Sequence, residues 1–207
     1  MIDLLLANGE VIRINVEEYL RAVVPGEMPS NWHPQALMAQ AVAARSYAAN
    51  TIEHPRHKEV SAHLCQPQPG LFVHCQAYDP QKINPRTDEA VYATRGIVMI
   101  YENSIVNALY HSDCGGHTLA NEDVFHGTPL AYLRGVTCIK NNKEITQTYT
   151  IAGKKQLHFG HRVGLCQNGA NWYAEFAGRS WEWILRHYYT GIEFCAYTEC
   201  PKNNVSG

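Results

Sequence analysis

The chain has 207 residues, a formal net charge of -2 and 45% hydrophobic residues, so it is long enough to bury a proper core. It carries no basic stripe or run of Lys and Arg that would neutralise phosphates, which argues against nucleic acid as a partner. No stretch approaches the roughly 18 apolar residues of a membrane span.

The first third of the chain predicts a hairpin followed by two helices. Residues 2–14 alternate weakly around Asn8-Gly9, a turn signal typical of hairpins. Asn15-Val16-Glu17-Glu18 is typical of a capping box and predicts a helix over about 16–24. Pro34 then opens an Ala-rich helix that we expect to end at about Asn50.

Glu27 lies between these two predicted helices, in the stretch Val24-Pro25-Gly26-Glu27-Met28-Pro29. The Pro and Gly residues predict a stiff turn, which places the carboxylate poorly for salt bridging and well for facing a cleft. Burial there would raise its pKa and make it a usable general acid. The alternative interpretation is a solvated glutamate on a loop.

The remainder of the chain predicts short elements around a long irregular excursion over 53–90, or a small lobe, ending in a short helix near 88–94. A loop of this length is usually functional or pinned by a crosslink. Beyond it we expect paired strands over 96–100 and 104–110, a loop over 111–130, a strand over 145–151, and helices after Gly169, with Ser180 as N-cap of 181–189 and Gly191 as a stop.

The order of these elements predicts an α+β fold rather than a regular βαβ alternation. We expect one mixed domain over residues 1–207, with an Ala-rich helix pair near the N-terminus, short antiparallel strands and a C-terminal helix.

The seven cysteines are more than an intracellular protein usually carries. The pairs Cys65/Cys75 and Cys195/Cys200 are spaced for local disulfides, and Cys166 is left over beside Cys114 and Cys138. The N-terminus lacks the basic region and cleavage site of a signal peptide. We therefore expect an extracytoplasmic protein (periplasm, cell wall or intermembrane space) whose leader or anchor is missing from this chain.

A cluster of metal-ligand residues follows the second predicted strand of the central pair. His111, Cys114 and His117 lie within seven residues of one another, and Cys138 would complete a tetrahedral site for Zn²⁺. The alternatives are a Cys114–Cys138 disulfide with the histidines lining a groove, and free thiols.

Three blocks, in this order, resemble the stage II sporulation protein D family. They are VEEYLRAVVPGEMPSNWHPQALMAQAVAARSYA, then HSDCGGHT with YLRGV, then GHRVGLCQNGA with WEWILRHYYTGIEF, and the resemblance covers roughly residues 11–195. It implies a peptidoglycan lytic transglycosylase that cleaves the bond between N-acetylmuramic acid and N-acetylglucosamine in denuded glycan strands. An N-acetylmuramoyl-L-alanine amidase is the partner it implies, and some members of the family carry zinc near the second block.

The resemblance also implies roles for individual residues. Glu27 matches the family's catalytic glutamate, as general acid and then base in formation of a 1,6-anhydro product. The substrate-binding residues it implies are Gln40, Arg45, Ser46, Tyr47, His161 and Gln167. Arg45 could instead complement the helix dipole. The third block departs from the family pattern at Arg162, Cys166 and Asn168, which bears on specificity.

Two other functions are consistent with the same residues. One is a non-catalytic module of the cell wall that binds glycan or activates an amidase. The other is a zinc hydrolase built on the His111, Cys114 and His117 cluster, although no general base stands at metalloprotease spacing.

Overall fold

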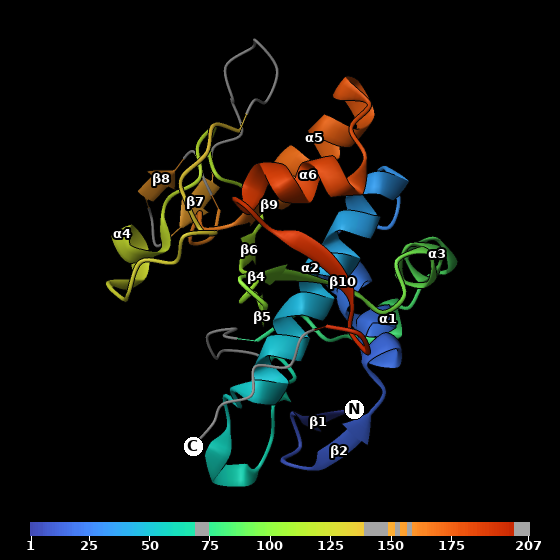
Figure 1. The fold of residues 1–207 in the computed structure, drawn as a ribbon. Helices are drawn as coiled ribbons and strands as arrows, with labels where there is room; N and C mark the ends of the chain where they lie inside the picture. The colour runs from blue at the N-terminus through green and yellow to red at the C-terminus, as the bar shows by residue number, and fades with distance from the viewer. Residues whose placement is uncertain (69–74, 139–148, 152–153, 157–158, 201–207) are drawn as a thin grey trace.

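A computed structural model describes residues 1–68, 75–138, 149–151, 154–156 and 159–200 (Figure 1). Its α-helices are α1 (Val16–Glu27), α2 (Pro34–Glu53), α3 (Pro85–Ala93), α4 (Asn121–Phe125), α5 (Gln167–Ala177) and α6 (Trp181–Tyr188), with 3-10 turns η1 (Lys58–Val60) and η2 (Pro80–Lys82). The strands are β1 (Ile2–Leu5), β2 (Val11–Ile14), β3 (Leu64–Cys65), β4 (Ile97–Tyr101), β5 (Ser104–Ile105), β6 (Tyr110–His111), β7 (Tyr149–Ile151), β8 (Lys154–Gln156), β9 (Leu165–Cys166) and β10 (Glu193–Ala196). The chain therefore has the expected α+β fold.

The long helix α2 is the centre of the molecule. Figure 1 shows it running through the middle, with α5 and α6 beside its N-terminal half and the β1–β2 hairpin near its other end. It packs against α1, α3, β4, α5 and α6. Its buried side chains face all directions, and its many alanines let these neighbours approach closely. The core is therefore built around one helix rather than over one sheet.

The helix α1 begins where the sequence predicts and ends later. The Asn15 side chain accepts a hydrogen bond from the Glu17 N–H, as a capping residue should. The stretch expected to form a turn continues the helix through Pro25 to Glu27. Pro25 gives up one backbone N–H, but Met28 N still donates to the Val24 carbonyl at 2.9 Å and completes the last turn. Glu27 is therefore the last residue of a helix, not a residue on a free turn.

The sheets are small and separate. The strand order β2-β1-β3 forms one sheet, β10-β4-β5 a second, and β7-β8 a two-stranded ladder. The expected hairpin at Asn8-Gly9 is confirmed, and so is the expected pairing of a strand over 96–100 with one that begins at Ser104. The expected strand over 104–110 divides into two pieces, because β6 leaves the hairpin and pairs with β9 in parallel. Of the strand expected over 145–151, residues 145–148 lie outside the described residues.

The C-terminal helices follow the predicted caps. The Ser180 side chain accepts a hydrogen bond from the Trp183 N–H, and α6 begins at the next residue, Trp181. Helix α5 begins at Gln167, earlier than expected, because the Cys166 side chain caps it by accepting from the Gly169 N–H. This early start places Gln167 at the junction of β9 and α5, close to the centre of the molecule.

Candidate active site around Glu27 and the adjoining cysteine cluster

The Glu27 carboxylate is held by three hydrogen-bond donors from distant parts of the chain. The Ala77 N–H donates to Oε1 at 2.7 Å and the Tyr110 hydroxyl to the same oxygen at 3.1 Å. Gln167 Nε2 donates to Oε2 at 3.2 Å. All three donors are neutral groups. They fix the orientation of the carboxylate without supplying a positive charge that would pair with it.

Burial raises the pKa of the Glu27 carboxyl above its ordinary value. The hydrogen bonds from Ala77, Gln167 and Tyr110 oppose this shift, as does the more distant charge of Lys82, but burial is the larger effect. A raised pKa increases the fraction of carboxyl that still carries its proton near neutral pH. Such a group is able to donate that proton to a substrate.

Gly26 explains how the end of α1 approaches Ala77. A Cβ atom at Gly26 would overlap with the Ala77 carbonyl oxygen, so only glycine fits between the two segments. This close approach lets the backbone of Ala77 donate to the neighbouring carboxylate of Glu27. In the Pro-Gly-Glu sequence, Gly26 therefore allows the close packing and Glu27 supplies the carboxylate.

A network of glutamine side chains surrounds the carboxylate. Gln167 Nε2 also donates to Gln40 Oε1 at 3.3 Å, and Gln76 Nε2 donates to the Tyr110 hydroxyl at 2.9 Å and to the Ala44 carbonyl at 3.1 Å. Within the described residues, Gln40 Nε2 and Gln76 Oε1 are buried without a hydrogen-bond partner. Such atoms are rare in native structures and are available to a ligand or to water. Gln76, Ala77 and Tyr110 were not predicted from the sequence to lie at this site.

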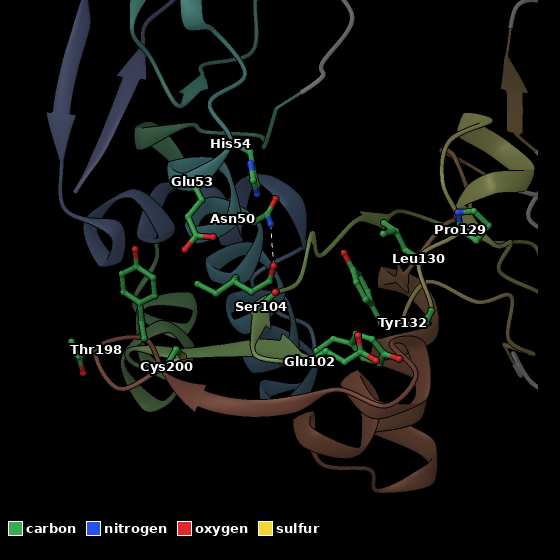
Figure 2. Close-up of a pocket in the computed structure, with 14 residues that line it drawn as sticks. Asn50, Glu53, His54, Glu102, Ser104, Pro129, Leu130, Tyr132, Thr198 and Cys200 are labelled. Carbon is green, nitrogen blue, oxygen red and sulfur yellow. Dashed lines mark hydrogen bonds between the residues drawn. The ribbon is translucent and has the colours of Figure 1, made fainter. Parts of the chain in front are cut away.

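Two pockets lie at different distances from this network. Residues 25–31 and Lys82 line an open pocket of about 450 Å³ that includes Glu27. A larger pocket of about 1110 Å³ is lined by residues of α2, the β4–β5 hairpin, 129–132 and the C-terminal segment, among them Tyr101, Glu102 and Tyr132 (Figure 2). Glu27 is not among the residues of the larger pocket, so we assign the candidate chemistry to the smaller one.

The structure does not bring Arg45 and Ser46 to Glu27. Arg45 is buried and binds Glu17 through two hydrogen bonds, at 2.9 and 2.7 Å, and it also donates to the carbonyls of Val91 and Ile97. The Ser46 hydroxyl donates to the Val42 carbonyl and accepts from the Met99 N–H. Both side chains join α2 to its neighbours, and Arg45 makes a buried ion pair rather than a helix-dipole contact.

Tyr47 and His161 lie near the candidate site without bonding to Glu27. Tyr47 is buried, and the Arg56 guanidinium lies 5.1 Å from the centre of its ring. His161 packs edge-on against His111, with ring centres 5.6 Å apart, and burial lowers its pKa to about 4. His161 therefore belongs to the surroundings of His111 rather than to the Glu27 network.

A cluster of cysteines adjoins the network through the parallel ladder of β6 and β9. Its register pairs Tyr110 with Leu165 and His111 with Cys166. Successive strand residues face opposite sides. Tyr110 thus reaches Glu27, while the ligand atoms of His111, Cys114 and Cys166 lie within 4.8 Å of one another.

Cys138 borders this cluster without belonging to the three residues whose ligand atoms all lie within 4.8 Å of one another. Its thiol is next to those of Cys114 and Cys166, and its Sγ lies 3.0 Å from the Tyr188 hydroxyl. His117, which the sequence suggested as a ligand, is exposed and is not among the residues whose ligand atoms converge. Cys166, the cysteine left over in the sequence, occupies the cluster instead. Cys114 and Cys138 are not bonded to each other in the structure, so the alternative Cys114–Cys138 disulfide is not formed.

The donor set of this cluster fits a zinc ion. His111 Nδ1 lies 3.2 Å from the Val163 carbonyl, which can only accept, so Nδ1 carries the proton and Nε2 keeps a lone pair. Nε2 is buried and has no partner among the residues that the structure describes. With Cys138 beside them, His111, Cys114 and Cys166 would supply one imidazole and three thiols, a Cys₃His set typical of closed structural zinc sites.

Comparison with known proteins agrees with the sequence motifs. Residues 7–101 match the family model described as stage II sporulation protein. The chain is 35% identical to an uncharacterized protein of Brachyspira hyodysenteriae over 136 residues, 65% of this chain and 35% of that protein. It is 36% identical to the amidase enhancer of Bacillus subtilis over 137 residues, 66% of this chain and 17% of that protein.

A third relative is matched over a larger part of the chain. The stage II sporulation protein D of Bacillus subtilis is 27% identical over 188 residues, 84% of this chain and 53% of that protein. In all three cases the match spans less than two thirds of the relative's length. Among the described residues, no helix is both long and apolar enough to cross a membrane. The match of residues 7–101 to the family model and the likeness to these relatives support the assignment of the chain to the stage II sporulation protein D family.

Proposed function

We propose that this protein is a peptidoglycan lytic transglycosylase with Glu27 as its acid and base. The observation that carries the proposal is the environment of Glu27, whose pKa is raised by burial and which is oriented by neutral donors only. Family membership and the likeness to an amidase enhancer support a role at the cell wall. Because peptidoglycan lies outside the cytoplasm, the proposal includes an extracytoplasmic location.

The proposed reaction needs one carboxyl group. Glu27 donates its proton to the glycosidic oxygen between N-acetylmuramic acid and N-acetylglucosamine as the bond from C1 to that oxygen breaks. The C6 hydroxyl of the muramic acid then bonds to C1, and the Glu27 carboxylate takes the hydroxyl proton. No water is consumed, and Glu27 ends the cycle protonated. Two-carboxylate glycosidases differ because their second carboxylate activates water or attacks the sugar.

The side chains around Glu27 would support this cycle in separate ways. Tyr110 and Gln167 keep the carboxylate in one orientation while it gains and loses a proton. Gln40 and Gln76, each with an unpartnered buried amide atom, are placed to bind sugar hydroxyl or acetamido groups. Denuded glycan strands are the proposed substrate, and an amidase that removes stem peptides is the proposed partner.

We also propose that His111, Cys114, Cys138 and Cys166 bind a structural zinc ion. In this ligand set Cys166 replaces the His117 of the sequence-based prediction. Zinc bound there would tie β6 to β9 and so hold Tyr110 and Gln167 on either side of the Glu27 carboxylate. Four protein ligands would leave no open position, so the ion would supply rigidity rather than an activated water.

The test is to incubate the wild-type protein and Glu27→Gln with amidase-treated peptidoglycan and identify the soluble products by mass spectrometry. Wild type should release fragments ending in 1,6-anhydro-N-acetylmuramic acid, and Glu27→Gln should lower the rate by about 10²–10⁴-fold. Glu18→Gln is the matched control, because Glu18 is exposed on the same helix. Reducing-end products from wild type would instead indicate a water-using hydrolase.

A second candidate function is a glycan-binding activator of an amidase, favoured by the 36% identity to an amidase enhancer. It predicts that wild type and Glu27→Gln both bind denuded glycan and both stimulate an added amidase, with no anhydro product from either. A co-sedimentation assay with insoluble peptidoglycan, combined with an amidase assay, distinguishes the two functions.

A further inference from the structure

A second group of metal-ligand side chains lies in the irregular excursion that follows α2. His57 comes just after α2, Cys65 is the last residue of β3, and Cys75 begins the segment that returns to the core. One ligand atom from each of these residues lies within 4.8 Å of the other two. Three segments of the excursion thus converge at one point, and none of these residues belongs to the cluster around His111.

The distances in this group suit a tetrahedral zinc ion. Cys75 Sγ lies 3.6 Å from His57 Nε2. A sulfur at about 2.3 Å and a nitrogen at about 2.0 Å from one tetrahedral zinc ion are separated by about 3.5 Å, close to the observed distance. The other ring nitrogen, His57 Nδ1, lies 3.5 Å from a carboxylate oxygen of Glu59. Metal-binding histidines commonly pair their second nitrogen with a carboxylate in this way.

The surrounding backbone also suits thiolate ligands. The Cys65 N–H donates to Cys75 Sγ at 3.3 Å. β3 itself is anchored, since it pairs in parallel with β1 and Gln66 N donates to the Leu5 carbonyl at 2.8 Å. Cys65 therefore offers its sulfur from a fixed strand, while Cys75 and His57 approach from the two flanking segments.

We propose that His57, Cys65 and Cys75 bind one zinc ion, with water as the fourth ligand. The bound ion would crosslink the segments of the excursion. It connects β3 and the residues after α2 to the segment that begins at Cys75. A disulfide between Cys65 and Cys75 would join two of these segments only and would leave His57 without a role.

The proposed zinc site is connected to the candidate active site through the residues that follow Cys75. Cys75 is followed by Gln76, which donates to the Tyr110 hydroxyl, and by Ala77, whose N–H donates to Glu27 Oε1. Binding of zinc at Cys75 would hold both donors in register with Glu27. This consequence for activity rests on the proposed function, whereas zinc binding itself does not.

The experiment measures zinc per chain by elemental mass spectrometry in full-length protein purified with zinc under mild reducing conditions. Cys75→Ser and His57→Ala should each contain one zinc ion fewer per chain than wild type. Cys195→Ser, a substitution on β10 outside both clusters, should keep the wild-type content. Cys114→Ser should lose zinc independently of Cys75→Ser, so failure at one cluster is distinguishable from failure at the other.

A measurement on wild type keeps the proposal testable if the variants do not fold. Alkylation followed by peptide mass spectrometry should find Cys65 and Cys75 protected by zinc and reactive after chelation. Cobalt replacing zinc should give thiolate-to-metal charge-transfer absorption that Cys75→Ser reduces. Equal zinc content in wild type and Cys75→Ser, or alkylation of both thiols that zinc does not change, would overturn the proposal.

Discussion

Two of the glutamates of helix α1, Glu17 and Glu27, each accept several hydrogen bonds, but their electrostatic surroundings differ. Glu17, in the first turn, accepts two bonds from the Arg45 guanidinium and one from the Gly96 N–H at 3.1 Å. Glu27, the last residue, accepts from a backbone N–H, a hydroxyl and an amide. The first carboxylate is paired with a full positive charge, whereas the second accepts only from neutral donors among the described residues.

This difference separates a carboxylate that joins two helices from one whose pKa is raised by burial. A buried ion pair keeps its charge because each partner stabilises the other, and removal of either leaves an uncompensated charge. A buried carboxylate with neutral donors costs free energy when ionised, so its pKa rises. The same residue type on the same helix therefore joins α1 to α2 at one end and offers an exchangeable proton at the other.

The largest expected effect comes from breaking the structural pair. Arg45→Met should lower the free energy of unfolding by about 3–5 kcal/mol, because Glu17 would stay partly buried without its partner. Chemical denaturation measures this change. Arg21→Met is the matched control and should change the free energy of unfolding much less, since Arg21 makes partly exposed ion pairs with Glu18 and Asp88. Lost activity in a fully stable Arg45→Met protein would instead place Arg45 in a substrate cleft.

The next effect comes from separating Ala77 from Glu27. Gly26→Ala should destabilise the protein by about 1–3 kcal/mol and lower its activity, because the new methyl group must displace the Ala77 carbonyl. Thermal unfolding and product release measure the two effects. Gly127→Ala, which introduces the same methyl group into open space, should change neither. A stabilised and fully active Gly26→Ala protein would show that the Ala77 segment has another position available.

A smaller effect tests the cost of the unpaired charge at Glu27. Burial gives the Glu27 carboxyl a higher pKa in the folded protein than in the unfolded chain. The protein therefore loses stability as the pH rises from the unfolded-state pKa through the folded-state pKa. Glu27→Gln removes that loss, so it should unfold at a higher temperature than wild type at neutral pH. The difference should shrink as pH falls and wild-type Glu27 becomes neutral. Unfolding temperatures across a pH series, with Glu18→Gln as control, measure this, and a destabilised Glu27→Gln at neutral pH would contradict it.

The smallest effect concerns a single hydrogen bond to the carboxylate. The Tyr110 hydroxyl bond lowers the pKa of Glu27, so Tyr110→Phe should raise it further. The protonated acid would then persist to higher pH, and the alkaline limb of the activity profile should move to higher pH. Tyr92→Phe, at an exposed tyrosine of α3, should leave the profile unchanged. A shift to lower pH would contradict the role assigned to Tyr110.

The local elements of the fold could be predicted because their signals lie within a few residues of one another. The Asn15 and Ser180 caps, the turn at Asn8-Gly9 and the Ala-rich pattern of α2 each specify a short piece of backbone. The family motif likewise identified Glu27, Gln40 and Gln167, which the structure places in one hydrogen-bond network. The predicted end of α1 was wrong. Pro25 and Gly26 usually end helices, but the packing at Ala77 accommodates them here.

The partners of these residues could not be predicted, because they depend on contacts between distant parts of the chain. Sequence alone determined that a glutamate follows Pro-Gly near two helices, and that His111, Cys114 and His117 lie within seven residues of one another. Only the tertiary structure decided that Arg45 binds Glu17, that Cys166 rather than His117 joins His111, and that Ala77 and Tyr110 hold Glu27. Caps and periodicity act through neighbouring residues, whereas these contacts arise from the parallel pairing of β6 with β9 and the packing of the excursion against α1.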